Sequence, residues 1–418
     1  MNKISTTSYI FAIFLLSQCI CQKDNSEIQT ALKSISDGSQ KFALDLFLKA
    51  ATTLKDTNSD EGDFMISPLS IWSGLILILE GASGNTLTEL QNTLRIDQNT
   101  SSVKEAYKSI NTALNVNTTN VQISNLQAIF TDKSHAINKD YEDTIQQTYQ
   151  ANFVPVDFKN GKEAATIIND FVKTSTQNLI KELVYPEDLS NAYLILISTI
   201  FFNGKWAVPF DKSDTKEEDF YGDDGKAVGK VNMMFKKERL NYGSIPQLDS
   251  VVFELPYDID NNLCMIVVLP NEGVRLFSVI SKLASVGPAG IFDVLQKVRQ
   301  EDEEGMETEL FFPRFTTETD FNLNSLLIEM GIRDLFSSKL ANLSKISEQS
   351  LHLSRIIHKT TIEVTENGTV ASAATALGID FLILSPTIKV NRPFAYFIVE
   401  KSTGSLLFLG QIKNPGVV

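Results

Sequence analysis

The order of hydrophobic patterns along the chain limits its fold more than any single motif does. Apolar residues recur at helical spacing over residues 40–53, 70–80, 87–94, 139–148 and 164–179. Strand-like apolar runs follow at 192–203, 251–255, 263–269 and 309–315, with further short runs beyond residue 359. Helices first and mostly strands later, without a βαβ alternation, predict an α+β fold with large antiparallel or mixed sheets.

The composition is that of a large globular chain with an acidic surface. The 418 residues are 43% hydrophobic and 21% charged, enough for one large domain or two ordinary ones. The formal net charge is −14. Because an acidic surface repels polyanions, we expect no nucleic-acid partner and no anionic membrane partner.

The N-terminus has the pattern of a secretory signal peptide. Lys3 precedes a short apolar run from Tyr9 to Leu16, and small residues, Cys19 and Cys21, stand before Gln22. The run is too short to cross a bilayer, and we expect no later run to be long enough. The sequence therefore predicts a signal peptide at residues 1–21 and a secreted, extracellular, soluble protein.

Residue types that serve catalysis or metal binding are scarce. Cys264, the one cysteine outside the signal peptide, lies in an apolar run and is expected to be a core residue. There are three histidines, and no hydrolase, zinc or nucleotide-binding motif occurs in the sequence. We expect no enzymatic activity, no metal and no cofactor. Four candidate glycosylation sequons begin at Asn99, Asn117, Asn342 and Asn367.

Residues 365–376, TENGTVASAATA, form a long run of small side chains. Over residues 369–382, alternate positions begin small and become apolar at Leu377, Ile379 and Phe381, which is the period of a half-buried strand. Alanine has low strand preference, so an exposed loop is the alternative interpretation. Small side chains would nevertheless let this segment slide between two existing strands without a clash.

Four motifs, in order, resemble the serpin family of loop-insertion protease inhibitors. They are FMISPLSI at 64–71, EGASGNTLTEL at 80–90, FFNGKWAVPF at 201–210 and NRPFAYFIVEKSTGSLLFLGQIKNP at 391–415. The resemblance runs from about Phe42 to the C-terminus. It implies a serpin fold, with helices packed on large mixed and antiparallel sheets and an exposed reactive loop. We expect a single serpin domain over residues 22–418 and a monomer.

The resemblance implies that the small-residue run is the hinge of a reactive loop at about residues 366–386. A serine protease would cut the loop and stay covalently attached while the loop enters the main sheet as a new strand. Family spacing places the cut bond at Leu382–Ile383, with Leu384–Ser385 as the alternative. Both favour a chymotrypsin- or elastase-like target with an apolar pocket. The implied hinge residues are Glu366, Gly368, Thr369, Val370, Ala371, Ser372, Ala373, Ala374, Thr375 and Ala376.

Other positions match structural roles of the family. The implied polar cluster under the opening sheet is Ser67, Ser70, Ser198 and His358. The implied insertion point, where the loop first enters, is Trp206, Arg314 and Glu366, with an Arg314–Glu366 pair. The sequence departs from the family at Asp63 and Ser198, where asparagine is usual, and at Val370, where glutamate is common.

Three functional interpretations follow from these residues. The leading one is a secreted suicide-substrate inhibitor, favoured by the small residues Ala371 to Ala374. A non-inhibitory serpin that stores or carries a ligand is the alternative, favoured by the Asn367 sequon, because a glycan there would obstruct the hinge. A hydrolytic enzyme is the third. Activation by heparin is not expected, since only Lys104 and Lys108 are basic within residues 102–115.

Overall fold

A computed structural model describes residues 33–53, 62–96, 100–113, 116–176, 180, 182–189, 191–257, 262–301, 307–320, 323–368, 385–401 and 403–416. The predicted signal peptide, the sequon at Asn99 and residues 369–384 of the reactive loop lie outside the described residues. These include the predicted bond Leu382–Ile383 and the hinge residues from Thr369 onwards.

Helices dominate the first part of the chain, as the sequence predicts. A helix at residues 33–53 is followed by α2 (Pro68–Gly81), α3 (Gly84–Leu94), α4 (Thr100–Ala113), α5 (Lys139–Asp143) and α6 (Gly161–Ser175). Three helices were not predicted, namely α4 and two later ones, α7 (Leu276–Glu301) and α8 (Leu323–Met330). Short turns of helix are η1 (Thr144–Thr148, π-helical), η2 (Pro186–Leu189), η3 (Lys212–Asp214), η4 (Pro246–Leu248) and η5 (Asp334–Phe336).

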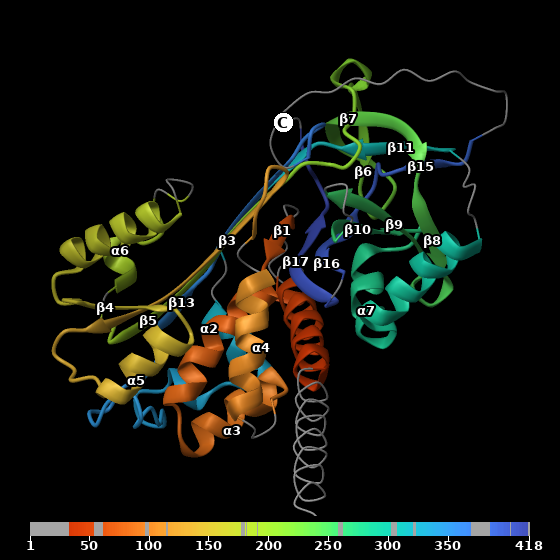
Figure 1. The fold of residues 1–418 in the computed structure, drawn as a ribbon. Coiled ribbons are helices and arrows are strands. Elements are labelled where there is room, and N and C mark those ends of the chain that lie inside the picture. Colours follow the sequence, from red (N-terminus) through yellow and green to blue (C-terminus); the bar gives the residue numbers. More distant parts are fainter. Residues whose placement is uncertain are drawn as a thin grey trace, which may run out of the picture.

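Three larger sheets and one strand pair make up the β-structure of the described residues. In spatial order, the first sheet is β1 (Phe64–Ile66), β17 (Ser405–Ile412), β16 (Phe394–Glu400), β10 (Leu263–Pro270), β9 (Ser250–Tyr257) and β8 (Asn241–Ile245). The second, at the top of Figure 1, is β15 (Thr387–Lys389), β11 (Glu307–Pro313), β7 (Ala227–Arg239) and β6 (Lys216–Tyr221).

The third sheet contains two long strands, β3 and β5, and crosses the molecule diagonally in Figure 1. Its order is β13 (Arg355–Ile357), β5 (Leu194–Gly204), β3 (Val121–Asp132) and β2 (Val116–Asn117), with β4 (Asn152–Val156) also paired to β3. We call it the long sheet. The separate strand pair is β12 (Phe315–Asp320) with β14 (Lys359–Val364).

The core lies between these sheets and the helices. The helix α2 is apolar on all sides and buried along nearly its whole length, which is typical of a central helix. Its N-terminus is capped by Ser67, whose side chain accepts from the Ser70 N–H, and Pro68 occupies the first turn, where it needs no N–H partner. Cys264 is fully buried on β10, in agreement with the core position expected for it.

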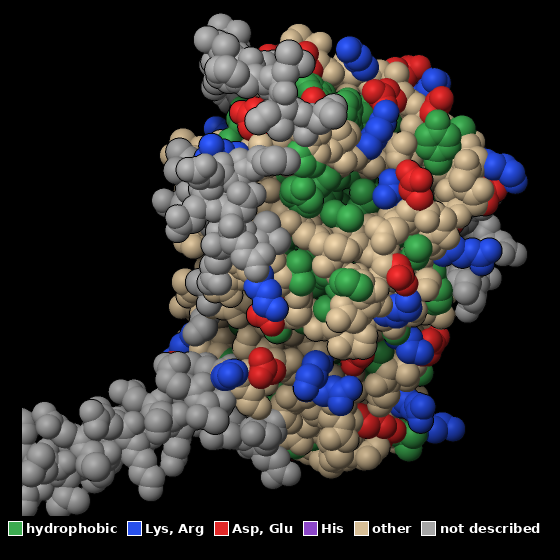
Figure 2. Space-filling view, turned by 90° about the vertical axis from the view of Figure 1, so that its right-hand side faces the viewer, with side chains coloured by type: hydrophobic (Ala, Val, Ile, Leu, Met, Phe, Trp, Pro, Cys, Tyr) green, Lys and Arg blue, Asp and Glu red, His purple; other side chains and the backbone are tan. Residues whose placement is uncertain are grey.

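One stretch of α7, Leu276–Lys297, has the length and mean hydropathy (1.3) of a membrane-crossing helix, contrary to the expectation that no run after the signal peptide would be long enough. At Gly287 the backbone leaves helical geometry (φ 67°, ψ 170°), and Pro288 follows. The stretch is therefore two shorter helices joined at a break. Figure 2 views this side of the molecule, where charged side chains of both signs are interspersed with apolar ones.

The stretch formed by β13 and β14 runs beside β5 but is paired with it only along β13. β13 pairs with β5 in parallel from Arg355↔Ile195 to Ile357↔Ile197. Beyond His358 the chain continues as β14, which pairs antiparallel with β12. Among the described residues, no ladder joins β14 to β5. The long sheet is thus closed at its lower end in Figure 1 and unpaired beside β14 at its upper end.

Candidate functional site

The chain reverses direction at the upper end of β14, where the reactive loop begins. Thr365 and Gly368 exchange backbone hydrogen bonds of 2.8 and 3.1 Å, closing a tight turn over Glu366 and Asn367. Gly368 also forms an antiparallel bridge with Lys205 at the end of β5. Gly368 therefore lies between the β5 side and the β14 side, and the chain there runs antiparallel to both.

Only glycine fits at Gly368. Its φ is +115°, which L side chains rarely adopt, and an added Cβ would lie 2.2 Å from the Gly204 oxygen. The close approach of the two backbones is what allows the bridge to Lys205.

The segment after β5 clamps this turn through its backbone. Trp206 N–H donates to the Asn367 oxygen (3.1 Å), and Phe210 N–H donates to the Glu366 oxygen (2.8 Å). The Trp206 indole donates to the Thr365 oxygen (3.0 Å), and its ring stacks on Tyr257 at 4.5 Å. The conformation of the turn therefore depends on residues 206–210.

The predicted Arg314–Glu366 pair is present, with Arg314 Nε 3.8 Å from Glu366 Oε2. Glu366 is only 2% exposed, and its other oxygen accepts from the Thr215 hydroxyl (2.8 Å). Buried Arg314 Nε makes no hydrogen bond, so the pair acts through charge alone. These residues line a polar hollow of about 450 Å³ with Lys212, Asn232, Glu363 and Thr365.

Lys236 on β7 supports the same region and was not singled out from the sequence. Its ammonium is buried, donates to the Val208 oxygen (3.0 Å), pairs with Glu238 and lies 4.5 Å from the centre of the Phe210 ring. Burial lowers its pKa, and Glu238 opposes that shift. Lys236 thus fixes residues 208–210, although nothing in the local sequence distinguishes it from the charged residues that follow it.

The four members predicted for the polar cluster lie together beneath the long sheet. Ser67 N–H donates to His358 Nε2 (3.1 Å), so the proton of the neutral ring is on Nδ1, which donates to the Ser198 oxygen (2.7 Å). The hydroxyls of Ser70 and Ser198 are 2.7 Å apart. Burial lowers the pKa of His358 to about 4. The cluster lies where β13 ends and β14 begins.

Two further members, Asn125 and Gln127 on β3, were missed. Gln127 Nε2 lies 3.0 Å from Ser70 Oγ and 3.1 Å from Ser198 Oγ, and Asn125 Oδ1 accepts from Ser70 Oγ (2.8 Å). The two share one face of β3. Their spacing of two would have indicated a polar strand face if the segment had been recognised as a strand.

Asp63, one of the departures from the family pattern, does not join this cluster. Its carboxylate accepts from the backbone N–H groups of Lys413 and Asn414, the latter at 3.1 Å. It therefore anchors the C-terminal segment beside β1.

At its far end the reactive loop meets a different sheet. The Pro386 oxygen accepts from Glu309 N–H (2.8 Å), and β15 pairs in parallel with β11. Ser385, which follows Leu384 in the alternative bond, directly precedes this attachment. The loop thus connects the top of the long sheet to the four-stranded sheet.

The described sequons differ in accessibility. Asn117 and Asn342 are exposed, whereas Asn367 is 6% exposed within the clamped turn. A glycan on Asn367 would require this turn to open. On α4, where heparin activation was not expected, Lys108 is paired with Glu105 (2.9 Å).

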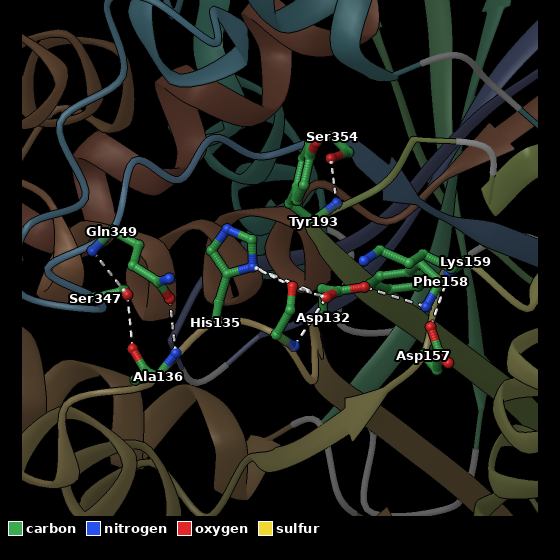
Figure 3. Close-up of polar contacts among 11 residues, drawn as sticks. Asp132, His135, Ala136, Asp157, Phe158, Lys159, Tyr193, Ser347, Gln349 and Ser354 are labelled. Atoms are coloured by element: carbon green, nitrogen blue, oxygen red, sulfur yellow. Dashed lines mark hydrogen bonds and ion pairs between the residues drawn. The ribbon is translucent and has the colours of Figure 1, made fainter.

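Asp132, Ser134 and His135 gather at the lower end of the long sheet, but they do not form a catalytic relay (Figure 3). A relay needs the imidazole between serine and carboxylate, with one ring nitrogen facing each. Here the Asp132 carboxylate accepts directly from the Ser134 hydroxyl. The single nitrogen His135 Nδ1 faces both groups, at 3.3 Å from Ser134 Oγ and 3.9 Å from Asp132.

Known proteins share this architecture. The sequence matches the family profile Serpin (serine protease inhibitor) over residues 37–415. Leukocyte elastase inhibitor from Homo sapiens is 31% identical over 389 residues, covering 92% of this chain and all of that protein. Human thyroxine-binding globulin superposes with a TM-score of 0.78 at 26% identity, covering 92% of this chain and 100% of its own. Uncleaved ovalbumin superposes with a TM-score of 0.77 at 25% identity, covering 91% and 100%. The predicted fold and family are confirmed, and the chain belongs to the serpin family.

Proposed function

We propose that this protein is a secreted inhibitor that traps a serine protease as a suicide substrate. The protease cuts the reactive loop, and the N-terminal part of the loop enters the long sheet between β5 and β14 with the protease attached. The protein is not a catalyst in this proposal, since its own turnover ends with the covalent complex.

The observation that carries the proposal is the position of Gly368 between Lys205 and Thr365, antiparallel to both. Parallel neighbours such as β5 and the β13–β14 stretch can each pair with a strand that runs antiparallel between them. Gly368 has the position and direction of the first residue of that strand. The unpaired stretch beside β14 offers the hydrogen-bonding partners below it.

The register set by these bridges agrees with the faces of the loop. Counting down from Gly368 and Lys205 would bring Thr375 opposite Ser198 and Leu377 opposite Leu196. Extending the Thr365–Gly368 pairing along β14 and β13 gives the same alignment. It would bring Leu377 opposite Ile356, and Ile356 itself pairs with Leu196. Opposite residues point to the same face, so the apolar alternate positions would join the face of β5 on which Leu194 and Leu196 belong to the main core. A shift of one residue would move them to the other face, where Ile195 and Ile197 belong to a separate core cluster.

The driving force follows from this burial. Leu377, Ile379 and Phe381 would each contribute roughly 1.5–3 kcal/mol on full burial, and a new ladder would form on both sides. About fourteen residues separate Gly368 from the bond after Leu382, which gives a strand of about 45 Å. The intact form forgoes this stabilisation and is held kinetically.

The target in this proposal is a chymotrypsin- or elastase-like protease. Leucine precedes the bond at both candidate positions, and the loop from Gly368 to Thr387 has no Arg or Lys for a trypsin-like pocket. The similarity to leukocyte elastase inhibitor supports the same choice. Secretion rests on the N-terminal pattern and is tested by N-terminal sequencing of the protein in culture medium.

The function is tested by incubating the mature protein with chymotrypsin, elastase and trypsin. We expect a complex with chymotrypsin or elastase that survives boiling in detergent, and only cleavage or no reaction with trypsin. Mass spectrometry of the released C-terminal fragment distinguishes cleavage after Leu382 from cleavage after Leu384. Cleavage by every protease without any stable complex would contradict the proposal.

A ligand carrier is the competing proposal, since one structural neighbour is named for binding thyroxine. An apolar site exists between the first helix, the break in α7 and the six-stranded sheet, lined by residues such as Leu44, Pro288 and Phe397. Its cavity volume is about 10 Å³, whereas small-molecule pockets occupy roughly 300–1,000 Å³. This site therefore gives the carrier role no support.

A further inference from the structure

The lower end of the long sheet is held together by contacts that cross the gap the loop would enter. The sheet order places β5 between β3 and β13, so a fully inserted loop would separate β5 from β13, which are paired at this end from Arg355↔Ile195 to Ile357↔Ile197. We call the boundary between β5 and β13 the gap. At this end, the chain leaves β3 after Asp132, enters β5 after Tyr193 and enters β13 after Ser354. Figure 3 shows this region.

Two hydrogen bonds cross the gap directly at the start of β5. Tyr193 N–H donates to the Ser354 hydroxyl (3.0 Å), and Ser354 N–H donates to the Leu194 oxygen (2.8 Å). Both join the start of β5, at Tyr193 and Leu194, to Ser354, the residue that precedes β13.

The segment after β3 also reaches across to the segment before β13. Ala136 N–H donates to Gln349 Oε1 (2.9 Å), and the Ser347 hydroxyl donates to the Ala136 oxygen (2.6 Å). Asn138 N–H donates to the Ile346 oxygen (2.8 Å). These bonds join the segment that follows β3 directly to the segment that precedes β13, and no residue of β5 takes part in them.

The rings of Tyr193, His135 and His352 are also in contact in this region. The Tyr193 ring lies 5.2 Å from the His135 ring and 5.6 Å from the His352 ring. His135 comes from the β3 side and His352 from the β13 side. Only the Tyr193–His352 contact crosses the gap, whereas His135 and Tyr193 stay on one side of it. His135 and His352, the two histidines outside the polar cluster, thus both pack against Tyr193.

We propose that these contacts form a basal clasp that must open for the loop to insert fully. The clasp consists of Tyr193 with His352 and Ser354, together with the bonds from Ala136 and Asn138 to residues 346–349. β5 has 11 residues, so a strand of about fourteen residues starting opposite Lys205 extends past Tyr193. Insertion would widen the β5–β13 spacing from about 4.8 Å to about twice that, breaking the clasp. This inference rests on the proposed function.

The clasp is a positioning device that opposes the last part of insertion. It stabilises the intact form alone, because its contacts across the gap cannot persist once a strand lies there. The His135–Tyr193 contact, on one side of the gap, should stabilise both forms equally. This difference distinguishes a clasp from ordinary packing.

The test compares melting temperatures of intact and loop-cleaved protein for the wild type, His352→Ala and His135→Ala. Thermolysin is used to cut the loop, because a zinc protease forms no acyl intermediate and is not trapped. We expect His352→Ala to lower the melting temperature of the intact form by about 1–2 °C and to leave the cleaved form unchanged. His135→Ala should lower both forms by similar amounts.

Each outcome decides between the two claims. If wild-type protein gains no thermal stability on cleavage, the proposed insertion is wrong. If it gains stability, and His352→Ala either shifts both forms equally or shifts neither, insertion stands and the clasp is refuted. Ser354→Ala, which removes one side-chain hydrogen bond across the gap, gives the same comparison should His352→Ala fold poorly.

Discussion

At the scale of single residues, Gly368 determines whether the loop starts in the right place. A side chain there would meet the Gly204 backbone at 2.2 Å and require a φ of +115°. Because backbone cannot yield as a side chain can, we expect Gly368→Ala to break the bridge to Lys205, at about 1–3 kcal/mol. The measurement is the fraction of protease trapped rather than released after cleavage, which should fall.

A matched control for this substitution is Gly225→Ala. Gly225 also has a positive φ (76°), but nothing lies within 4 Å of an added Cβ. It carries the conformational strain without the clash and lies outside the site. Equal trapping by wild type and Gly368→Ala would contradict the role given to Gly368.

His358 makes the stability of the intact protein depend on pH. Its folded-state pKa is about 4, against an ordinary 6.5, because burial of the ring lowers the pKa more than the hydrogen bond to the Ser198 oxygen raises it. The unfolded chain therefore binds a proton between pH 6.5 and 4 that the folded chain excludes. Stability is fully present above this window and falls with pH through it, by up to about 3 kcal/mol.

The measurement is the urea midpoint of the intact protein across this range, compared with His358→Gln, which cannot titrate. The wild type should lose more stability than the variant between pH 6.5 and 4. Parallel curves would show that His358 is not responsible.

At the scale of elements, the incoming strand depends on small side chains near its start. Thr369→Arg would place a charged side chain at the first position below Gly368, inside a packed sheet. We expect it to convert the inhibitor into a substrate that is cut and released, measured as loss of the detergent-stable complex at an unchanged cleavage rate. Thr119→Arg is a matched control, because it also removes a sequon threonine but at an exposed position. Undiminished trapping by Thr369→Arg would contradict strand insertion.

Helices and strands differ in how well the sequence predicts them. Elements with long apolar runs, such as α2 and β10, were predicted to within a few residues. β3 was missed because Asn125 and Gln127 interrupt the apolar alternation that begins at Val121 and Ile123. Those polar residues are tolerated because Asn125 and Gln127 bond the polar cluster. α7 was missed because Gly287 and Pro288 break its helical pattern.

The candidate site likewise contains residues that the sequence predicts and residues that it does not. Its motif residues could be identified from the resemblance, since each of them lies within or close to a short stretch of sequence that matches a family motif. Lys236 and the basal clasp could not, because they depend on contacts between segments separated by many residues. A lysine among other charges, or a histidine after a strand, carries no local signal of such contacts.

At the scale of the whole molecule, the net charge of −14 should affect how quickly a protease arrives. Opposite charge speeds association, and salt screens the effect. We expect the rate of complex formation with a cationic elastase to fall as salt concentration rises, measured by stopped-flow inhibition kinetics. An anionic protease of the same specificity is the control and should show the reverse. Salt-independent rates for both would contradict the expectation.

The stretch beside β14, which no described ladder joins to β5, has a consequence for storage of the protein. An open strand edge accepts any extended chain of suitable shape, whether or not it belongs to the same molecule. A second copy's loop, or a free peptide copied from residues 369–382, could occupy it first. Concentrated, warmed solutions should therefore form linked chains of molecules, and the peptide should prevent both this linkage and inhibition.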